Sequence, residues 1–194
     1  MLRSYCGYTA VFNGGCYFSG AAVRLRDHLR LLWEQHVYWT RMVILSIAFD
    51  LPDLETNTNR LLRNAPDFAR LFGHFYGDGI ASEFGSLIRD HLVIAAELVK
   101  AAKIGDSGAA ADAEKRWYAN GDKIVYFLNS INPYWSVDRM RATWFEHLAL
   151  TKAEAVATLN KNYTGSIETF NQIEKQAMMM ADDFSSGIIY QYSL

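Results

Sequence analysis

Three histidines with similar sequence surroundings are the residues of this chain best suited to chemistry. His36, His91 and His147 follow one another at nearly equal intervals. Each comes directly after an acidic or amide residue and directly before an apolar run. A near-constant period of this kind indicates a repeated helical unit, which would place the three side chains at a similar height. Neutral imidazole is a common ligand for zinc and iron, so the pattern predicts a metal site.

A carboxylate that could complete such a site follows the third histidine. Glu154 lies seven residues after His147, and two helical turns return it to the same helix face. His36, His91, His147 and Glu154 therefore form the candidate ligand set for iron, zinc or manganese. The chain contains neither Glu-x-x-His nor His-Glu-x-x-His, so it lacks the familiar signatures of di-iron bundles and zinc proteases.

Two other interpretations of the same residues stay open. In the first, the histidines are structural and each hydrogen-bonds a polar side chain on the next helix, as a buried imidazole requires. The candidate partners are Asn64 or Asp67 for His36 and Asn120 or Asp122 for His91. The chain would then be a non-enzymatic binding or structural module. In the second, a pocket for a small molecule is lined by four tryptophans: Trp33, Trp39, Trp117 and Trp144.

The elements that must position these residues are all helices. Apolar residues recur at three- and four-residue steps over 23–49, 52–63, 67–75, 78–104, 108–131, 137–160 and 166–190. No segment shows the sustained alternation that is typical of a strand. Because short connections make consecutive helices antiparallel neighbours, we expect three helical hairpins. The predicted fold is an all-α, up-and-down bundle of about six helices, ferritin-like or related, with residues 23–194 as a single domain.

Composition excludes several functions. A formal net charge of −2 argues against nucleic-acid binding, and no apolar run is long enough to span a membrane. A small-molecule ligand and a homo-oligomer both stay open, as does an enzymatic role. Residues 1–22 are expected to form an irregular arm, with a degenerate leader as the alternative. Cys6 and Cys16 form either a disulfide or two free thiols, and a cytoplasmic location is slightly favoured over secretion.

Several runs resemble a group of uncharacterised bacterial proteins, found mainly in clostridia and bacilli. The resemblance covers about 23–192 and is carried by His36-Val-Tyr-Trp-Thr-Arg41, Arg60-Leu-Leu-Arg-Asn64, Trp117-Tyr-Ala-Asn120-Gly-Asp122 and His147-Leu-Ala-Leu-Thr151. Some members carry the label acetylglutamate kinase, which does not fit this chain, because such a kinase needs an α/β fold and glycine-rich phosphate loops. More distantly, the chain resembles ferritin-like helical proteins of bacilli that hold metal. The resemblance implies a helical, metal-holding protein without an established activity.

Overall fold

The computed structural model describes residues 19–194, and these residues are helical with no strand, as the sequence predicts. The described residues form seven helices: α1 (Gly20–Ala48), α2 (Leu54–Leu62), α3 (Asn64–Tyr76), α4 (Asp78–Lys103), α5 (Ser107–Ile131), α6 (Val137–Leu159) and α7 (Tyr163–Tyr192). In this part of the chain no helix is both long and apolar enough to cross a membrane. Both cysteines, and most of the predicted irregular arm, lie outside the described residues.

Helices α1, α3 and α7 begin clearly earlier than the apolar pattern predicts, and local polar contacts explain two of these starts. The Ser19 side chain accepts a hydrogen bond from the Ala22 backbone N–H, so α1 begins at Gly20 instead of residue 23. The Asn162 side chain accepts one from the Gly165 N–H, so α7 begins at Tyr163 instead of residue 166. Only Arg63 separates α2 from α3, and the two form one bent rod.

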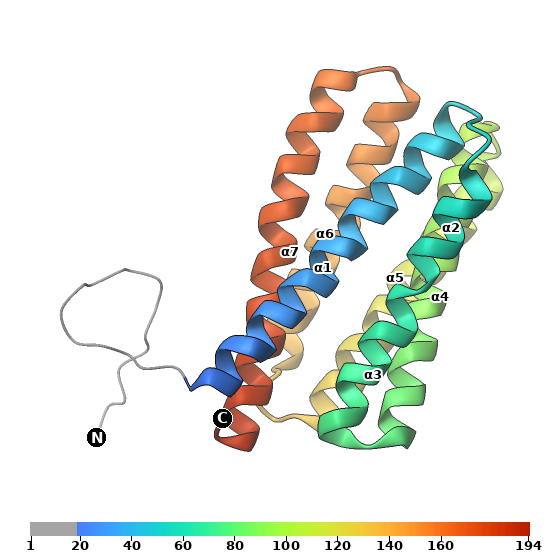
Figure 1. The fold of residues 1–194 in the computed structure, drawn as a ribbon. Coiled ribbons are helices and arrows are strands. Elements are labelled where there is room, and N and C mark those ends of the chain that lie inside the picture. Colours follow the sequence, from blue (N-terminus) through green and yellow to red (C-terminus); the bar gives the residue numbers. More distant parts are fainter. Residues whose placement is uncertain (1–18) are drawn as a thin grey trace.

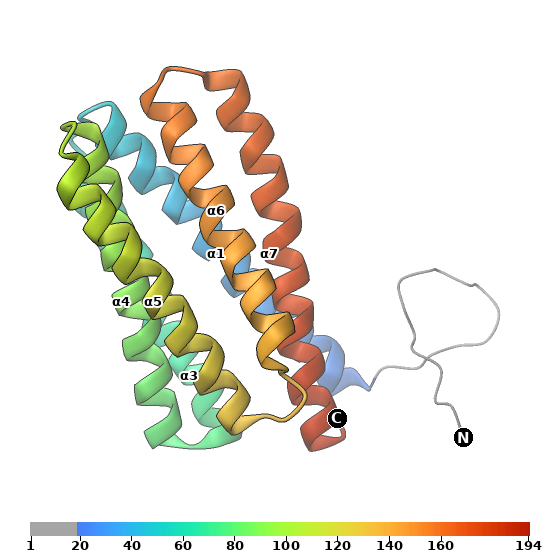
Figure 2. The same cartoon turned by 180° about the vertical axis from the view of Figure 1, so that it is seen from behind.

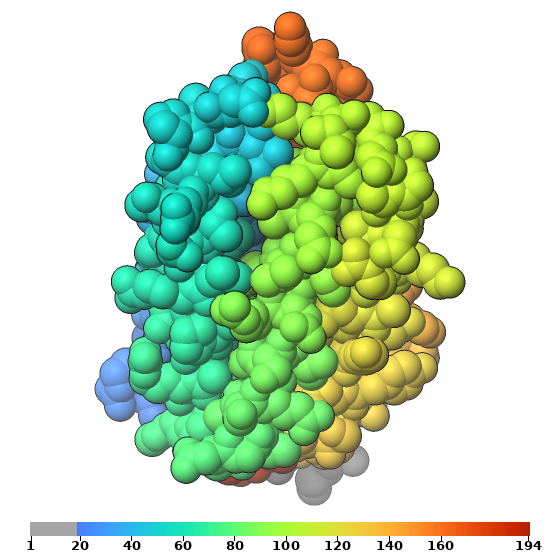
Figure 3. Space-filling view, turned by 90° about the vertical axis from the view of Figure 1, so that its right-hand side faces the viewer, coloured from blue at the N-terminus to red at the C-terminus, as the bar shows by residue number. Residues whose placement is uncertain are grey.

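The rods form a closed ring (Figure 1). Each helix packs against the next in the chain, and α7 closes the ring by packing against α1. Successive rods alternate in direction, so α1, α4 and α6 run the same way, and Figure 2 shows α6 between α5 and α7 from behind. In Figure 3, α4 lies between the α2–α3 rod and α5 on the outer face. Helix α1 also contacts α4 and α6 across the ring, so these three parallel helices share the interior.

A cluster of large aromatic side chains fills the lower half of this interior, toward the chain termini in Figure 1. The Phe72 and Phe84 rings stack with centroids 3.9 Å apart, and Phe184 and Trp135 pack around them. All four side chains are at most 1% exposed. Burial of each such ring stabilises the fold by about 2–3 kcal/mol relative to an exposed position.

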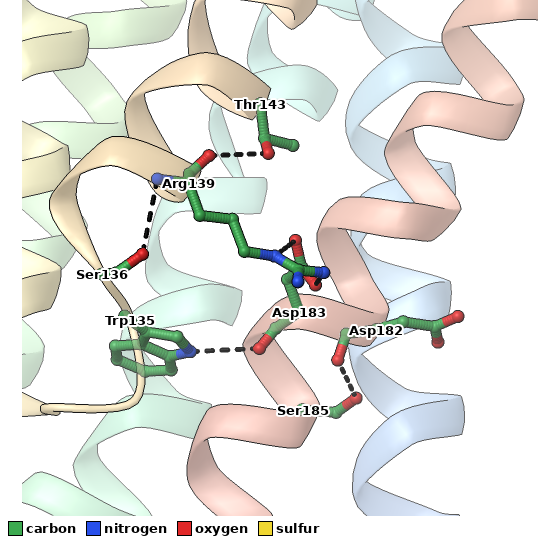
Figure 4. Close-up of polar contacts among 7 residues, drawn as sticks. All are labelled: Trp135, Ser136, Arg139, Thr143, Asp182, Asp183 and Ser185. Carbon is green, nitrogen blue, oxygen red and sulfur yellow. Dashed lines mark hydrogen bonds and ion pairs between the residues drawn. The ribbon is translucent and has the colours of Figure 1, made fainter. Parts of the chain in front are cut away.

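Trp135 is seated where the connection into α6 crosses α7 (Figure 4). Its indole N–H donates to the Asp183 carbonyl at 3.1 Å, while the neighbouring Ser136 side chain accepts from the Arg139 N–H and caps α6. The Arg139 guanidinium reaches over to the Asp183 carboxylate and ties the same turn of α7 to α6. A Cβ atom added at Gly187 would lie 2.0 Å from the Trp135 Nε1, so this position has no room for a side chain.

We therefore expect Gly187→Ala to destabilise the fold by about 1–3 kcal/mol, because the new methyl group displaces the indole and breaks its hydrogen bond. Urea unfolding at neutral pH measures the loss. Gly79→Ala is the matched control, since Gly79 is also helical but a Cβ there meets no atom of the described residues within 4 Å. The control should be neutral or stabilising by up to about 1 kcal/mol. Equal effects of the two substitutions would contradict the packing argument.

Candidate metal centre

The three histidines meet in the centre of the bundle. His36 on α1, His91 on α4 and His147 on α6 are each at most 3% exposed. One ring nitrogen of each lies within 4.8 Å of those of the other two. The parallel course of α1, α4 and α6 brings residues at equivalent positions to one height, as their near-constant spacing in the sequence predicts. Among the described residues this is the one group of three or more potential ligand side chains that is close enough to share an ion.

Each imidazole has an amide partner on the following helix rod. The Nδ1 atom of His36 lies 3.0 Å from Asn64 Oδ1. The Nδ1 atom of His91 lies 3.1 Å from Asn120 Oδ1. In the third pair, His147 Nδ1 lies 3.2 Å from Gln176 Oε1. These contacts confirm the predicted partners Asn64 and Asn120 and exclude Asp67 and Asp122 from that role.

The nitrogen of each amide is held by a backbone carbonyl on the histidine's own helix. Asn64 donates to the Leu32 carbonyl at 3.0 Å and Asn120 to the Leu87 carbonyl at 3.1 Å. Gln176 donates to the Thr143 carbonyl at 2.8 Å. In all three cases the carbonyl belongs to the residue four positions before the histidine. It already accepts the histidine's own N–H within the helix, and its second lone pair takes the amide.

This chain of contacts fixes which nitrogen of each ring carries the proton. A carbonyl oxygen can only accept, so the amide must turn its nitrogen toward the backbone and its oxygen toward Nδ1. The oxygen in turn requires a donor, so Nδ1 must carry the hydrogen. A neutral imidazole has only one N–H, which leaves Nε2 as a bare lone pair in all three rings. Nδ1 faces the amide in every case, which places the bare Nε2 on the other edge of each ring.

Two of the bare nitrogens face each other. His36 Nε2 and His147 Nε2 are 3.3 Å apart, and the two ring centroids are separated by 5.3 Å. The His91 ring stacks at 6.0 Å from His36 and 6.2 Å from His147. Because both Nε2 atoms are acceptors, two lone pairs at this separation repel unless a proton or a cation lies between them. The arrangement is a ready-made site for a positive charge.

Burial keeps the three rings neutral. Desolvation lowers the pKa of His36 to about 4, although its contact with Asn64 raises it in part. Desolvation and then the neighbouring His36 lower the pKa of His147 to about 3. For His91 desolvation is again the first cause, joined by both other histidines, and its pKa lies well below the usual 6.5. At neutral pH a proton is therefore a poor occupant, and all three imidazoles are in the form that binds metal.

Three tryptophans pack against the cluster. Trp33 packs edge-on against His36 and His147, with ring centroids 5.3 and 5.8 Å away. Trp144 packs edge-on against His91 at 5.5 Å, and Trp117 lies at 5.3 Å from the same ring. The indole N–H groups of Trp33, Trp117 and Trp144 are buried without a hydrogen-bond partner among the described residues. Trp39 does not join them and lies under the Arg60 guanidinium. Of the four tryptophans predicted to line a small-molecule pocket, Trp117 alone is part of a cavity lining in the described residues.

Glu154 is not part of the cluster. It is 1% exposed, but its carboxylate forms an ion pair with Arg41, whose guanidinium also donates to Ser166. Burial raises the Glu154 pKa to about 7, because desolvation exceeds the attraction of Arg41. The seven-residue spacing does return Glu154 to the His147 face, but it lies two turns, or about 10.5 Å, farther along the axis. The sequence therefore predicted the helix face of Glu154 correctly, but its place in the ligand set wrongly.

Substituting Glu154 therefore separates a ligand from a structural ion pair. We expect Glu154→Gln to leave metal stoichiometry and affinity within about twofold, because the side chain is tied to Arg41 and not to the three rings. Isothermal titration of parent and variant with Zn²⁺ or Co²⁺ tests this. A tenfold or larger loss of affinity would return Glu154 to the ligand set.

Gln176 is the site residue that the sequence interpretation did not assign. Asn64, Asn120 and Gln176 stand at equal intervals in the sequence, so the period itself carried the signal. The change from Asn to Gln hid the equivalence, although both side chains present the same amide.

No protein-family model, curated protein or solved structure matches this chain, so the proposed function rests on the geometry of the described residues.

Proposed function

We propose that this protein binds one divalent transition metal ion through the Nε2 atoms of His36, His91 and His147. The observation that carries the proposal is the hydrogen-bond relay from backbone carbonyl to amide to Nδ1, repeated at all three rings. Metal-bound histidines almost always donate their other N–H to an oxygen acceptor, which orients the ring and fixes the tautomer. A purely structural histidine does not require its second nitrogen to face two others.

The distances support a small tetrahedral ion. Metal–nitrogen bonds of about 2.05 Å at tetrahedral angles separate two ligand nitrogens by about 3.3–3.4 Å. The His36 and His147 Nε2 atoms are 3.3 Å apart. The His91 nitrogen lies within 4.8 Å of the others, so a shift of its side chain by about 1.5 Å would complete the triangle.

The ligand set favours zinc or iron. Imidazole nitrogen suits zinc, iron, copper and nickel, whereas manganese prefers carboxylate oxygen, which this cluster lacks. Three protein ligands leave one tetrahedral position for water or another molecule, the pattern of catalytic instead of structural zinc sites. A metal held in this way would polarise a bound water or carbonyl oxygen. The amides would orient the rings, and Trp33 and Trp144 would exclude water from the side on which they pack.

The relay also supports an internal triplication. We infer that three helical hairpins, α1 with α2–α3, α4 with α5, and α6 with α7, are copies of one unit. Each copy supplies a histidine, its carbonyl and its amide, followed by a small buried residue: Ala65, Gly121 or Ala177. A ferritin-like relationship remains a hypothesis about ancestry, since the ligand set proposed here contains none of the glutamates of di-metal bundles.

A binding or structural module with three structural histidines is the second candidate. The satisfied Nδ1 atoms favour it, because each ring already has one good partner inside the core. It predicts no metal in the purified protein. This candidate does not explain why the bare Nε2 atoms of His36 and His147 lie in contact.

Metal content of the full chain, made without a histidine tag in metal-replete medium, distinguishes the two candidates. We expect about one zinc or iron ion per chain by elemental analysis, since site affinity is gained with the folded state. After chelation, titration with Co²⁺ should reach the same stoichiometry and give the intense visible bands of a four-coordinate ion. Fewer than about 0.2 ions per chain, together with no cobalt bands, would sink the proposal.

A further inference from the structure

A cavity lies one helical turn from the three histidines, none of which is part of its lining. It has a volume of about 280 Å³ and lies between α1, α2, α4, α5 and α6. Thr40, Ala95 and Thr151 line it, and each follows one of the histidines by four residues, or one helical turn. On the other side of the rings stand Trp33, Ile88 and Trp144, each three residues before a histidine and at most 2% exposed. The cluster is therefore closed on one side by large side chains and bordered by small ones on the cavity side.

The wall of the cavity is aliphatic. Leucine, valine and alanine side chains from five helices form most of it, among them Leu92, Val99, Ala110, Ala155 and Leu159. Along α6 the lining extends from Thr151 to Leu159, a rise of about 12 Å. Water gains nothing from such a wall, whereas a hydrocarbon chain would bury its surface there.

Besides the hydroxyls of Thr40, Thr151 and Ser107, the lining has three side chains with stronger polar groups: Glu114, Lys152 and Trp117. Glu114 on α5 and Lys152 on α6 form an ion pair at 2.6 Å, with both side chains at least one-third exposed, and so mark the solvent side. Trp117 lines the cavity and packs on the His91 ring, and its buried indole N–H has no acceptor in the described part of the chain. A ligand head at the histidine end would find an N–H donor beside it.

The charge of the proposed metal ion favours a ligand with an anionic head group. Three neutral imidazoles leave both positive charges of a divalent metal uncompensated in a buried site. The nearby buried carboxylate, Glu154, is already paired with Arg41. An anionic oxygen at the open position would neutralise part of this charge, and Trp117 would donate to it.

We propose that the cavity binds the hydrocarbon chain of a medium-chain monocarboxylate whose carboxylate occupies the open metal position. This inference rests on the proposed metal site and names the class of ligand for it. The lining, about 12 Å long, accommodates an unbranched chain of up to about ten carbons, at about 1.3 Å per bond. Affinity should then rise with chain length, about fourfold for each methylene group buried.

The test uses the full chain loaded with Co²⁺ and titrated with acetate, butyrate, hexanoate and octanoate. Each carboxylate that reaches the metal changes the visible spectrum of the cobalt. We expect the dissociation constant to fall by about tenfold or more with every two added carbons up to octanoate. Equal constants for acetate and octanoate would overturn the cavity assignment while leaving the metal site intact. Failure of cobalt to bind at all would overturn both proposals.

Two cavity-filling variants locate the chain. Ala95→Leu adds volume next to the rings, and Ala110→Leu does so on α5 at the far end of the lining, so that either one serves if the other fails to fold. Both should bind cobalt as the parent does and lose at least tenfold in octanoate affinity, and Ala110→Leu, away from the rings, should also keep the acetate affinity of the parent. Ala157→Leu is the matched control, because Ala157 is half-buried on α6 outside the lining. Unchanged octanoate affinity in both cavity variants would place the chain elsewhere and overturn the proposal.

Discussion

Replacing any one of the three clustered histidines with leucine should lower the affinity for Zn²⁺ or Co²⁺ by at least about a hundredfold. Loss of an orienting partner alone costs about 10–100-fold in known sites, and loss of a ligand exceeds that. His36→Leu, His91→Leu and His147→Leu should behave alike, because the relay of contacts is the same at each ring. Isothermal titration and the cobalt spectrum measure the loss.

The chain supplies its own control for this experiment. His28 and His74 are exposed and lie outside the cluster. The double variant His28→Leu with His74→Leu should bind one ion per chain with the affinity of the parent. If it loses the metal while the single variants of the buried histidines retain it, the ions are bound at the surface and the buried site is wrong.

A paired substitution separates metal binding from folding. His147→Leu leaves the Gln176 oxygen buried without a donor, which should cost about 1–3 kcal/mol of stability in the metal-free protein. Adding Gln176→Leu removes that orphaned group, and the Thr143 carbonyl keeps its helical hydrogen bond. We expect the double variant to regain most of the lost stability and none of the metal affinity. Chemical unfolding without metal provides the first measurement and cobalt titration the second.

The histidine cluster could be predicted from the sequence because it depends on a regular spacing along the chain, which does not require knowledge of how the side chains pack. His36, His91 and His147 recur at nearly equal spacing on helices that run the same way, so a common height follows from connectivity alone. The partners Asn64 and Asn120 followed from the same period. Their orientation did not, because it depends on carbonyl lone pairs that only the packed helices bring within reach.

Glu154 and the tryptophans show what a helical pattern does not predict, namely which side chains of other helices a residue contacts. A heptad spacing gives the face of a helix but not the level of a partner, and Arg41 reaches Glu154 from another helix. Trp117 lines the cavity and Trp39 packs under Arg60, although both stand on helical stripes rich in apolar residues. The small residues that create the cavity, such as Ala95 and Ala155, carry no chemical signature in the sequence.

Metal-free protein should lose stability steeply as the pH falls below about 6.5. The folded-state pKa of His36 is lowered to about 4 and that of His147 to about 3, and that of His91 lies well below 6.5. At pH values between these folded-state pKa values and 6.5, the three histidines are protonated in the unfolded chain and neutral in the folded chain. Each of the three histidines then removes up to about 1.4 kcal/mol of stability per pH unit.

Glu154 acts in the opposite direction. Its folded-state pKa is raised from 4.5 to about 7, so the folded chain takes up a proton first, and the associated stability is lost as the pH rises through this window. One opposing group against three leaves a net loss of roughly 2–3 kcal/mol per unit on acidification from pH 6.5 to about 4.5. Because a typical domain is stable by about 5–15 kcal/mol, unfolding should set in near pH 4–5.

Urea unfolding of metal-free protein at several pH values between 7 and 4.5 measures this slope. His91→Leu should reduce it by about one proton's worth, or about 1.4 kcal/mol per unit. An identical slope in parent and His91→Leu would mean that the rings take up protons in the folded state. The Nε2 atoms of the cluster would then share a proton. The assignment of three neutral imidazoles, on which the proposed metal site depends, would be wrong.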